Sequence, residues 1–223
     1  PWPMAQEFFP DAETNIYGLS GFVGRDGGPT VIRAARKVLQ RPRRFGIGVC
    51  FEAAPVDPRA QEGLVALLEA VGYFGIFEAE LVEARGRLHL IDFNPRPYSQ
   101  IAFDEARGLP LALLHYLGAT GQTSTLEALL GQAAATPYSA GEATAYHHRL
   151  LLDGVRVAQW AARRLYTTPA EPWGTWLSEH EGRAADAVRA KDDPLPAALD
   201  VGKHLSQALR HPRSFVRSFR REG

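Results

Sequence analysis

The chain has 223 residues, 45% of them hydrophobic and 22% charged, which is typical of a folded globular protein and excludes a fibrous or low-complexity one. Its 25 basic and 25 acidic residues give a formal net charge of zero, so no overall field favours nucleic acid or a membrane surface. The single cysteine, Cys50, excludes an internal disulfide framework, and no apolar run has the length of a membrane span. We therefore expect a cytoplasmic protein without a membrane partner.

Most strand signals lie in the first half of the chain. Short runs of β-branched and aromatic residues read as strands at residues 4–9 (alternatively a linker), 15–23, 29–39, 49–53, 73–83 and 87–94. The turn sequence GRDGG joins the second and third of these runs, and ARGR joins the last two. Each of these two pairs is predicted to form an antiparallel hairpin.

The clearest helix signal spans residues 57–72. Asp57 suits the N-cap, Pro58 suits the first helical position, and Gly72 suits the C-terminal end. Weaker signals predict helices at residues 109–119, 123–131 and 198–212, a strand within 141–152 and a loop at 169–176.

Together these elements predict an α+β fold. We expect an antiparallel β-sheet with helices packed on one face, followed by a mostly helical C-terminal extension. The expected division places the sheet lobe in residues 1–119 and the extension, packed on that lobe, in residues 120–223.

The second hairpin carries the chemistry, because its strands hold Glu80, Asp92 and Asn94. If Glu80 opposes Asp92, then Ala84 opposes Leu88 across a three-residue loop, and all three polar side chains share one face of the sheet. Two carboxylates and an amide oxygen suit Mg²⁺ or Mn²⁺. From the residue types alone, an exposed face whose acids simply meet water remains an equal alternative.

Arg96 follows directly after this strand, between Pro95 and Pro97. A guanidinium offers a forked set of donors that matches phosphate and carboxylate oxygens. The two prolines restrict the backbone on either side of it. Arg96 is therefore the first candidate for a catalytic phosphate contact.

The stretch GYFGIFEAELVEARGRLHLIDFNPRP, residues 72–97, resembles the C-terminal strand pair of ATP-grasp ligases, in the branch of carboxylate–amine ligases and carbamoyl-phosphate-synthase-like proteins. The resemblance implies that Glu80, Asp92 and Asn94 bind magnesium ions. This family usually has Glu where the chain has Asp92, so a shorter side chain would bind the metal here.

The same resemblance extends to the segment AQEFFP and covers roughly residues 4–119. It implies that this segment is the hinge that contacts ATP, through Gln6, Glu7, Phe8 and Phe9, and that Glu13, or secondarily Asp11, holds the ribose. It also implies that Arg36 and Lys37 face the phosphates or the second substrate. A solvated basic strand end is an alternative for these two residues.

The implied function is that of an ATP- and Mg²⁺-dependent ligase, which activates a carboxylate as an acyl phosphate for attack by an amine or similar nucleophile. The chain opens at the hinge, so we expect it to be part of a longer enzyme whose N-terminal lobe is its partner, and to be inactive alone. A non-catalytic ATP-grasp-like binding or scaffold module is the alternative. Nucleic acid is not an expected partner, although the basic residues 211–223 leave RNA as a minor alternative.

Overall fold

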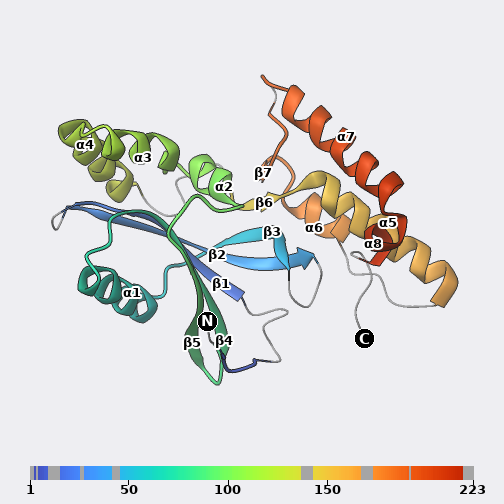
Figure 1. Ribbon diagram of the computed structural model, residues 1–223, viewed down its shortest axis with the longest axis horizontal. Helices are drawn as coiled ribbons and strands as arrows, with labels where there is room; N and C mark the ends of the chain where they lie inside the picture. Colours follow the sequence, from blue (N-terminus) through green and yellow to red (C-terminus); the bar gives the residue numbers. More distant parts are fainter. Residues whose placement is uncertain are drawn as a thin grey trace.

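The computed structural model describes residues 3, 5–9, 16–25, 28–41, 46–136, 143–166, 173–190 and 192–217, without the side chains of residues 158–166, 173–174 and 215–217 (Figure 1). The strands in these ranges are β1 (Ile16–Val23), β2 (Thr30–Arg41), β3 (Ile47–Ala54), β4 (Gly75–Ala84), β5 (Arg87–Asn94), β6 (Ala145–His147) and β7 (Ala184–Asp186). The helices are α1 (Pro58–Ala70), α2 (Ile101–Ala106), α3 (Leu111–Ala119), α4 (Thr123–Ala135), α5 (Arg149–Tyr166), α6 (Trp173–Glu179), α7 (Leu195–Arg210) and α8 (Pro212–Arg217).

The strands form a single sheet in the order β5-β4-β1-β2-β3-β6-β7. All neighbouring strands are antiparallel except β6 and β7, which are parallel. The fold is therefore α+β, as predicted, and both predicted hairpins are present. None of the helices in the described part of the chain combines the length and the apolar character that crossing a lipid bilayer requires.

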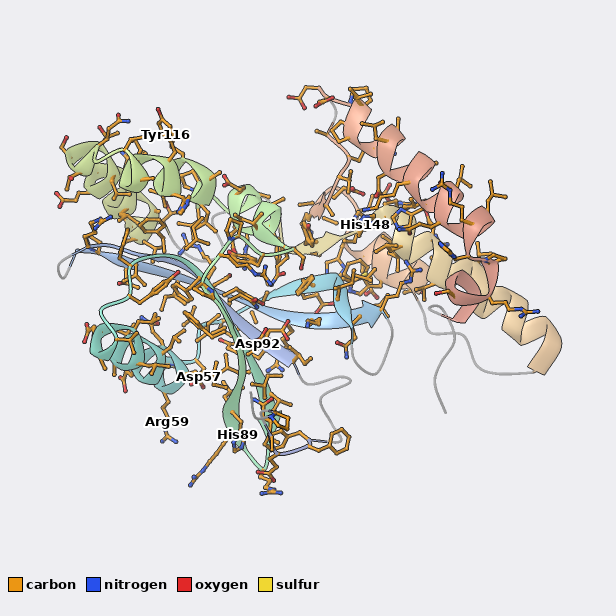
Figure 2. The ribbon with its side chains drawn as sticks, viewed as in Figure 1. Asp57, Arg59, His89, Asp92, Tyr116 and His148 are labelled. Carbon is orange, nitrogen blue, oxygen red and sulfur yellow. The ribbon has the colours of Figure 1, made fainter. Side chains whose placement is uncertain are left out.

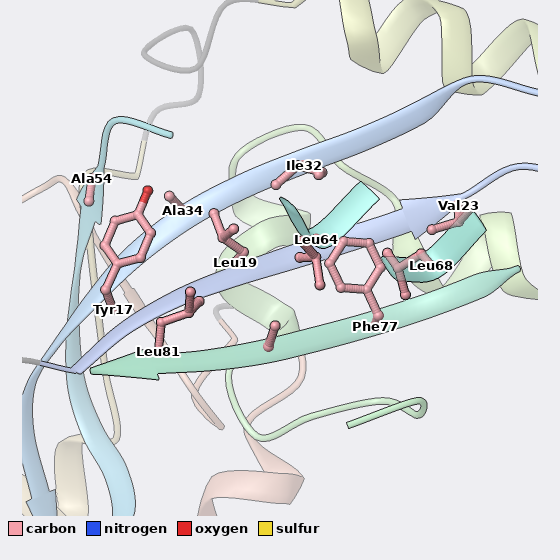
Figure 3. Packing of buried hydrophobic residues seen from close by; sticks show 11 residues of the cluster. Tyr17, Leu19, Val23, Ile32, Ala34, Ala54, Leu64, Leu68, Phe77 and Leu81 are labelled. Atoms are coloured by element: carbon pink, nitrogen blue, oxygen red, sulfur yellow. The ribbon is translucent and has the colours of Figure 1, made fainter. Parts of the chain in front are cut away.

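Helices cover both faces of this sheet, so the expected single helical layer is wrong. Leu19 and Phe77 pack against α1 on one face, whereas Phe22 and Ile76 pack against α3 and α4 on the other (Figures 1 and 3). Side chains of a strand alternate between faces, and these strands carry apolar residues in both sets. We call the two sides the α1 face and the α2–α4 face.

Helix α1 begins as the sequence predicts. The Asp57 carboxylate accepts a hydrogen bond of 2.8 Å from the Ala60 backbone N–H, and Pro58 occupies the first turn. Gly72, at φ +63°, adopts the left-handed conformation that terminates helices. One edge of the helix is buried against the sheet through Leu64 and Leu68 (Figure 3).

A buried polar cluster attaches α2 to the α2–α4 face. Asp104 accepts hydrogen bonds from Ser20, at 2.7 Å, and from the Tyr98 hydroxyl, and it forms an ion pair with Arg107. Arg107 donates to the Ala34 carbonyl oxygen of β2 at 2.8 Å. Burial, together with the Asp104 charge, raises the pKa of Tyr98 well above its usual value, so the phenol keeps its proton. These contacts tie α2 to two strands.

The second half of the chain departs from the prediction in several places. Only Ala145–His147 of the expected strand within 141–152 is extended, and α5 begins at Arg149. The expected loop at 169–176 is helical from Trp173, and β7 was not predicted. Because β6 and β7 join the sheet of the first half, hydrogen bonding connects the two halves of the chain directly. The division at residue 119 remains a prediction.

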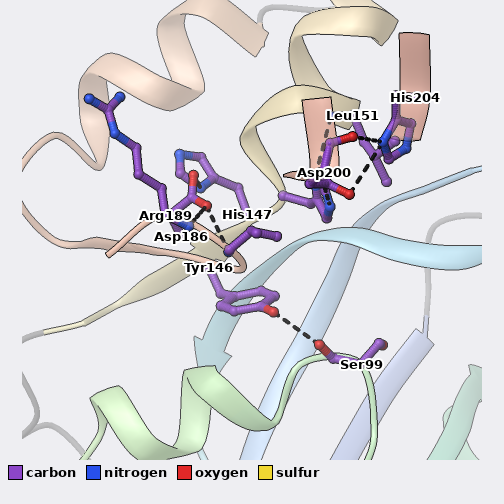
Figure 4. A network of polar contacts seen from close by, with 10 residues as sticks. Ser99, Tyr146, His147, Leu151, Asp186, Arg189, Asp200 and His204 are labelled. Carbon is purple, nitrogen blue, oxygen red and sulfur yellow. Dashed lines mark hydrogen bonds and ion pairs between the residues drawn. The ribbon is translucent and has the colours of Figure 1, made fainter. Parts of the chain in front are cut away.

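Asp200 of helix α7 contacts His148, outside this helix, and His204 within it (Figure 4). The Asp200 carboxylate lies 3.3 Å from His148 Nε2 and 3.3 Å from His204 Nδ1. The Leu151 backbone N–H donates to His148 Nδ1 at 3.4 Å, so the neutral tautomer that carries its proton on Nε2 satisfies both ring nitrogens. Burial lowers the pKa of His148, and His204 adds to this, although Asp200 and Asp186 oppose it.

Two adjacent leucines of α1 allow a matched test of the core. Leu68 is 2% exposed and Leu67 is 45% exposed. We expect Leu68→Ala to lower the free energy of unfolding by about 2–5 kcal/mol, because it leaves a cavity under the helix. Leu67→Ala should change it by less than about 0.5 kcal/mol. Urea denaturation measures both, and equal losses would contradict this packing of α1.

A second prediction concerns His148 and pH. Because the folded-state pKa of His148 is lowered, the unfolded chain binds a proton more readily, and stability should fall as the pH drops below about 6.5. His148→Gln should lose less stability than the parent chain between about pH 7.5 and pH 5.5. His115→Gln, at an exposed position of α3, is the control and should follow the parent chain. Thermal unfolding across this pH range decides the question.

Candidate functional site

The pairing of β4 with β5 places the predicted acidic residues on one face of the sheet. Glu80 lies opposite Asp92, and Glu78 lies opposite Asn94. Directly opposed residues of an antiparallel pair point to the same side, and residues two apart on one strand do so too. Glu78, Glu80, Asp92 and Asn94 therefore all belong to the α2–α4 face. Figure 2 shows Asp92 at the sheet.

This pairing arises in a different way from the predicted one. Ala84 pairs with Arg87 rather than with Leu88, so the loop has two residues, Arg85 and Gly86, both at positive φ. With this two-residue loop and a regular pairing of the strands, Glu80 would lie opposite Ile91. A β-bulge between Glu80 and Leu81 adds one residue on β5 and shifts the register back.

Hydrogen bonds join three of these side chains, Glu78, Asp92 and Asn94, with Gln100 into a network. Asn94 Nδ2 donates to Glu78 Oε2 at 2.8 Å and to Asp92 Oδ2 at 3.0 Å. Gln100, just before α2, donates from Nε2 to Glu78 Oε1 at 2.9 Å. The positive end of the Asn94 amide thus lies between two carboxylates. This is a position that attracts positive charge.

Lys37 of β2 supplies a cation to the same face. Its Nζ lies 2.5 Å from Glu80 Oε1, with the two side chains only 6% and 21% exposed. Lys37 reaches Glu80 across β1, where the residue paired with Glu80 is Gly18. A glycine there has no side chain that could obstruct the contact. Lys37, Glu80, Glu78 and Gln100 also border one small hollow in this face.

Glu78 is the most perturbed acid of the network. It is 3% exposed, and its burial raises the pKa, with a further increase from the charge of Glu80. Hydrogen bonds from Gln100 and Asn94 and the charge of Lys37 oppose the shift. The chain therefore keeps, in the centre of this face, a carboxyl group whose ionised form is destabilised by burial. Such perturbed groups concentrate at functional sites.

The donor set suits a hard divalent cation. Two carboxylates and an amide that can turn its oxygen inward are typical ligands of Mg²⁺, which fills its shell with water and substrate phosphates. Within the described ranges, no three acidic, histidine or cysteine side chains converge into a complete metal cage. Asn94 and Lys37 currently satisfy these acids, so a cation would have to displace their N–H groups.

The structure separates the three predicted catalytic cations. Lys37 lies beside the acids, but Arg36, one residue earlier on β2, points to the α1 face and forms an ion pair of 3.1 Å with Glu83. Arg96 is exposed beyond β5 and donates to the Pro97 carbonyl oxygen at 2.9 Å. Arg33 shares the face of Lys37 but is buried against α4, where it donates to the Ala133 carbonyl oxygen.

The predicted hinge residues run beside the β4–β5 hairpin and form no strand. Gln6 donates to the Ile91 carbonyl oxygen at 2.8 Å, and Glu7 pairs with Arg85 at 2.8 Å. Phe9 is buried against Val82 and Ala84, whereas Phe8 is more than half exposed. Val82 shares the face of Glu80, so Phe9 lies on the side that carries the acids.

Two of the sequence predictions fall on residues outside the described ranges. These are Glu13 and its alternative, Asp11. Their assignment to the ribose stays a prediction.

Two members of the network were missed or undervalued. Glu78 follows the same alternation as Glu80, and the predicted register with Glu80 opposite Asp92 already implies that Glu78 lies opposite Asn94. Gln100 lies six residues after Asn94, beyond the end of β5, and only the return of the chain before α2 brings it to Glu78.

The raised pKa of Glu78 has a measurable consequence. The folded chain holds this proton more tightly than the unfolded chain, so stability should decline as the pH rises from about 4.5 through the raised pKa. Glu78→Gln removes the titration and should show a smaller decline between about pH 5 and pH 8. Glu83→Gln, an exposed change on the same strand, should follow the parent chain in urea denaturation. Parallel curves for all three proteins would contradict the burial of this charge.

Comparisons with known proteins give partial likenesses. No family model matches the chain, and no curated protein does. The phosphoribosylaminoimidazole carboxylase ATPase subunit from Aquifex aeolicus is 17% identical with a TM-score of 0.41, over 48% of this chain and 33% of that one. Rhizobium etli pyruvate carboxylase is 18% identical with a TM-score of 0.36, over 46% and 10%. A single-chain, multi-domain long-chain acyl-CoA carboxylase is 17% identical with a TM-score of 0.41, over 54% and 12%.

The matched region therefore spans a third or less of each of these proteins. The activities in their names are stated for those proteins. The chain is similar to these carboxylases in part of its fold. The resemblance of its second hairpin to ATP-grasp ligases is a separate observation, made on the sequence.

Proposed function

We propose that this chain carries the metal- and phosphate-facing side of an ATP- and Mg²⁺-dependent ligase of the ATP-grasp type. The observation that carries the proposal is the convergence of Glu78, Glu80, Asp92 and Asn94 on one sheet face with Lys37. Carboxylate and amide oxygens beside a buried ammonium are the groups that a nucleotide phosphate with its metal requires.

Each of these side chains has a proposed role. Asp92, Glu80 and Asn94 would hold the metal, with the Asn94 amide turned so that its oxygen faces the ion, and Glu78 would keep Asn94 in position by their hydrogen bond. Bound Mg²⁺, or Mn²⁺, would supply neutralisation of the phosphate charge. If Glu80 bound the metal, Lys37 would lose this partner, and its ammonium would be available to donate to a phosphate oxygen.

The nucleotide would extend from this site toward the hinge segment. Phe9 and Gln6 lie on or beside the hairpin that also carries the acids, which supports a base-binding role for residues 6–9. Glu13 remains the proposed ribose contact. Arg96 follows the end of β5, and its exposed guanidinium would turn from the Pro97 carbonyl oxygen toward the transferring phosphoryl group. Arg36 is left out of this site because it lies on the opposite face.

The proposed reaction transfers the terminal phosphoryl group of ATP to a substrate carboxylate oxygen, which yields ADP and an acyl phosphate. An amine then attacks the acyl carbon, inorganic phosphate leaves, and a carbon–nitrogen bond results. The chain contributes positioning and charge stabilisation and no covalent nucleophile. The N-terminal lobe of the same protein would close over the nucleotide. A cytoplasmic location belongs to the same proposal.

One observation favours a non-catalytic binding module instead. Lys37 already neutralises Glu80, and the Asn94 amide already bridges Glu78 and Asp92, so the network is satisfied without a metal. Internally compensated charges of this kind also occur in purely structural clusters. The two functions differ in whether a divalent ion can open these contacts.

Titration of the chain with Mn²⁺, followed by paramagnetic broadening of its amide signals, distinguishes the two. We expect broadening around residues 78–80 and 92–94, and at least about tenfold weaker binding in Asp92→Asn, since even outer-shell partners of a metal contribute that much. Glu83→Gln removes an acid of the same hairpin from the other face and should leave the affinity unchanged. Absence of local broadening, or equal effects of both variants, would contradict a metal site here.

A further inference from the structure

A sizeable hollow lies on the side of the sheet away from the acidic network. Its volume is about 670 Å³, and its walls come from the start of α1, the end of β3 and the turn between β4 and β5. Cavities of about 300–1,000 Å³ are of the size that binds small molecules. Arg36, whose role the proposed ligase site does not explain, is one of its wall residues.

Strand alternation separates this cavity from the proposed ligase site. Arg36 and Lys37 are consecutive residues of β2 and point to opposite faces. Tyr17 pairs directly with Arg36 and lines the cavity, whereas the neighbouring Ile16 and Gly18 border the hollow beside Glu80. The sheet therefore lies between the two sites, and a ligand in one cannot touch the side chains of the other.

The side chains around the cavity carry an excess of positive charge. Arg36, Arg59 and Arg87 line it together with two acids, Asp57 and Glu83. Both acids are already engaged, since Asp57 caps α1 and Glu83 pairs with Arg36 at 3.1 Å. Arg59 and Arg87 form no hydrogen bond or ion pair with any residue in the described ranges. Their guanidinium groups are available to a ligand. Figure 2 shows Arg59 projecting from the start of α1.

The floor of the cavity is rigidly built. Tyr17 is buried, its hydroxyl donates to the Pro55 carbonyl oxygen at 2.7 Å, and it accepts from the Asp57 backbone N–H at 2.8 Å. These bonds hold the segment that leads into α1. The Arg36 guanidinium lies over the Tyr17 ring, 5.8 Å from its centre. The first turn of α1 contains no acidic residue, so the positive end of its dipole adds to the field.

We propose that this cavity is a second binding site, which takes a small molecule bearing a phosphate group. Arg59 and Arg87 supply forked donors to the phosphate oxygens, and Arg36 turns from Glu83 to complete the set. Tyr17 and the apolar part of the wall accommodate the organic part of the ligand. The site goes beyond the proposed ligase function, because it needs neither the metal nor the acids of the other face.

Inorganic pyrophosphate is the probe for this site. The chain is titrated with it in the presence of a chelator, and amide shifts are followed by NMR. We expect saturable shifts at residues 36, 57–60 and 87. Arg87→Ala and Arg59→Ala should each weaken binding about fivefold. This is the upper end of the contribution that one exposed charge pair makes to affinity. Both positions are exposed, so the variants should retain the unfolding temperature of the parent chain.

Two controls identify the source of any binding. Arg85→Ala removes an arginine from the same turn that does not line the cavity, and it should leave the affinity unchanged. Asp92→Asn alters the proposed metal site alone and should also bind pyrophosphate normally. Equal weakening by Arg85→Ala would mean general attraction to a basic surface and would overturn the proposal. Loss of binding in Asp92→Asn, or shifts confined to residues 78–80 and 92–94, would overturn it too.

Discussion

The register between β4 and β5 is the constraint on which the candidate site depends. A shift of one residue would send Asp92 and Asn94 to the α1 face, away from Glu78, Glu80 and Lys37. The chain reaches the productive register by combining a two-residue turn with a bulge. Turn and bulge are thus coupled, since either one alone would separate the carboxylates.

The same alternation divides the charges of the chain between two surfaces. On the α2–α4 face, carboxylates and amides surround one ammonium, whereas on the α1 face arginines outnumber the acids around a larger hollow. The net charge of zero conceals this division. One face is suited to a cation with its phosphates, and the other to an anion directly.

Burial explains why binding a ligand costs more free energy at one surface than at the other. Glu78 and Lys37 are nearly inaccessible, so every polar atom there needs a partner, and the hydrogen bonds of Asn94 and Gln100 supply them. The arginines around the cavity are solvated and need no such network. A ligand at the buried site must replace existing contacts, whereas a ligand at the cavity can use free donors.

Sequence reasoning succeeded where the signal is local. The cap at Asp57, the apolar spacing of α1 and the two hairpins are each encoded within a few residues, and the pairing of Glu80 with Asp92 came from the same short range. The predicted length of the loop between β4 and β5 was wrong, since it has two residues and not three. A bulge has no clear residue signature, and the two errors, one in the loop and one in the strand, cancelled.

Contacts between distant segments were not accessible in this way. Whether helices cover one face or two depends on where α3 and α4 return, and β7 is too short to form except beside β6. The contact of His148, just before α5, with Asp200 of α7 joins segments that no periodicity relates.

The sequence by itself determined the two hairpins, the first helix and the set of oxygen-bearing side chains on the second hairpin, because hydrogen bonding and alternation within a short stretch specify them. Only the tertiary structure decided which cation joins those acids. Lys37 and Arg36 are chemically similar neighbours, and the direction of β2 across β1 turns one toward the carboxylates and the other to the opposite face.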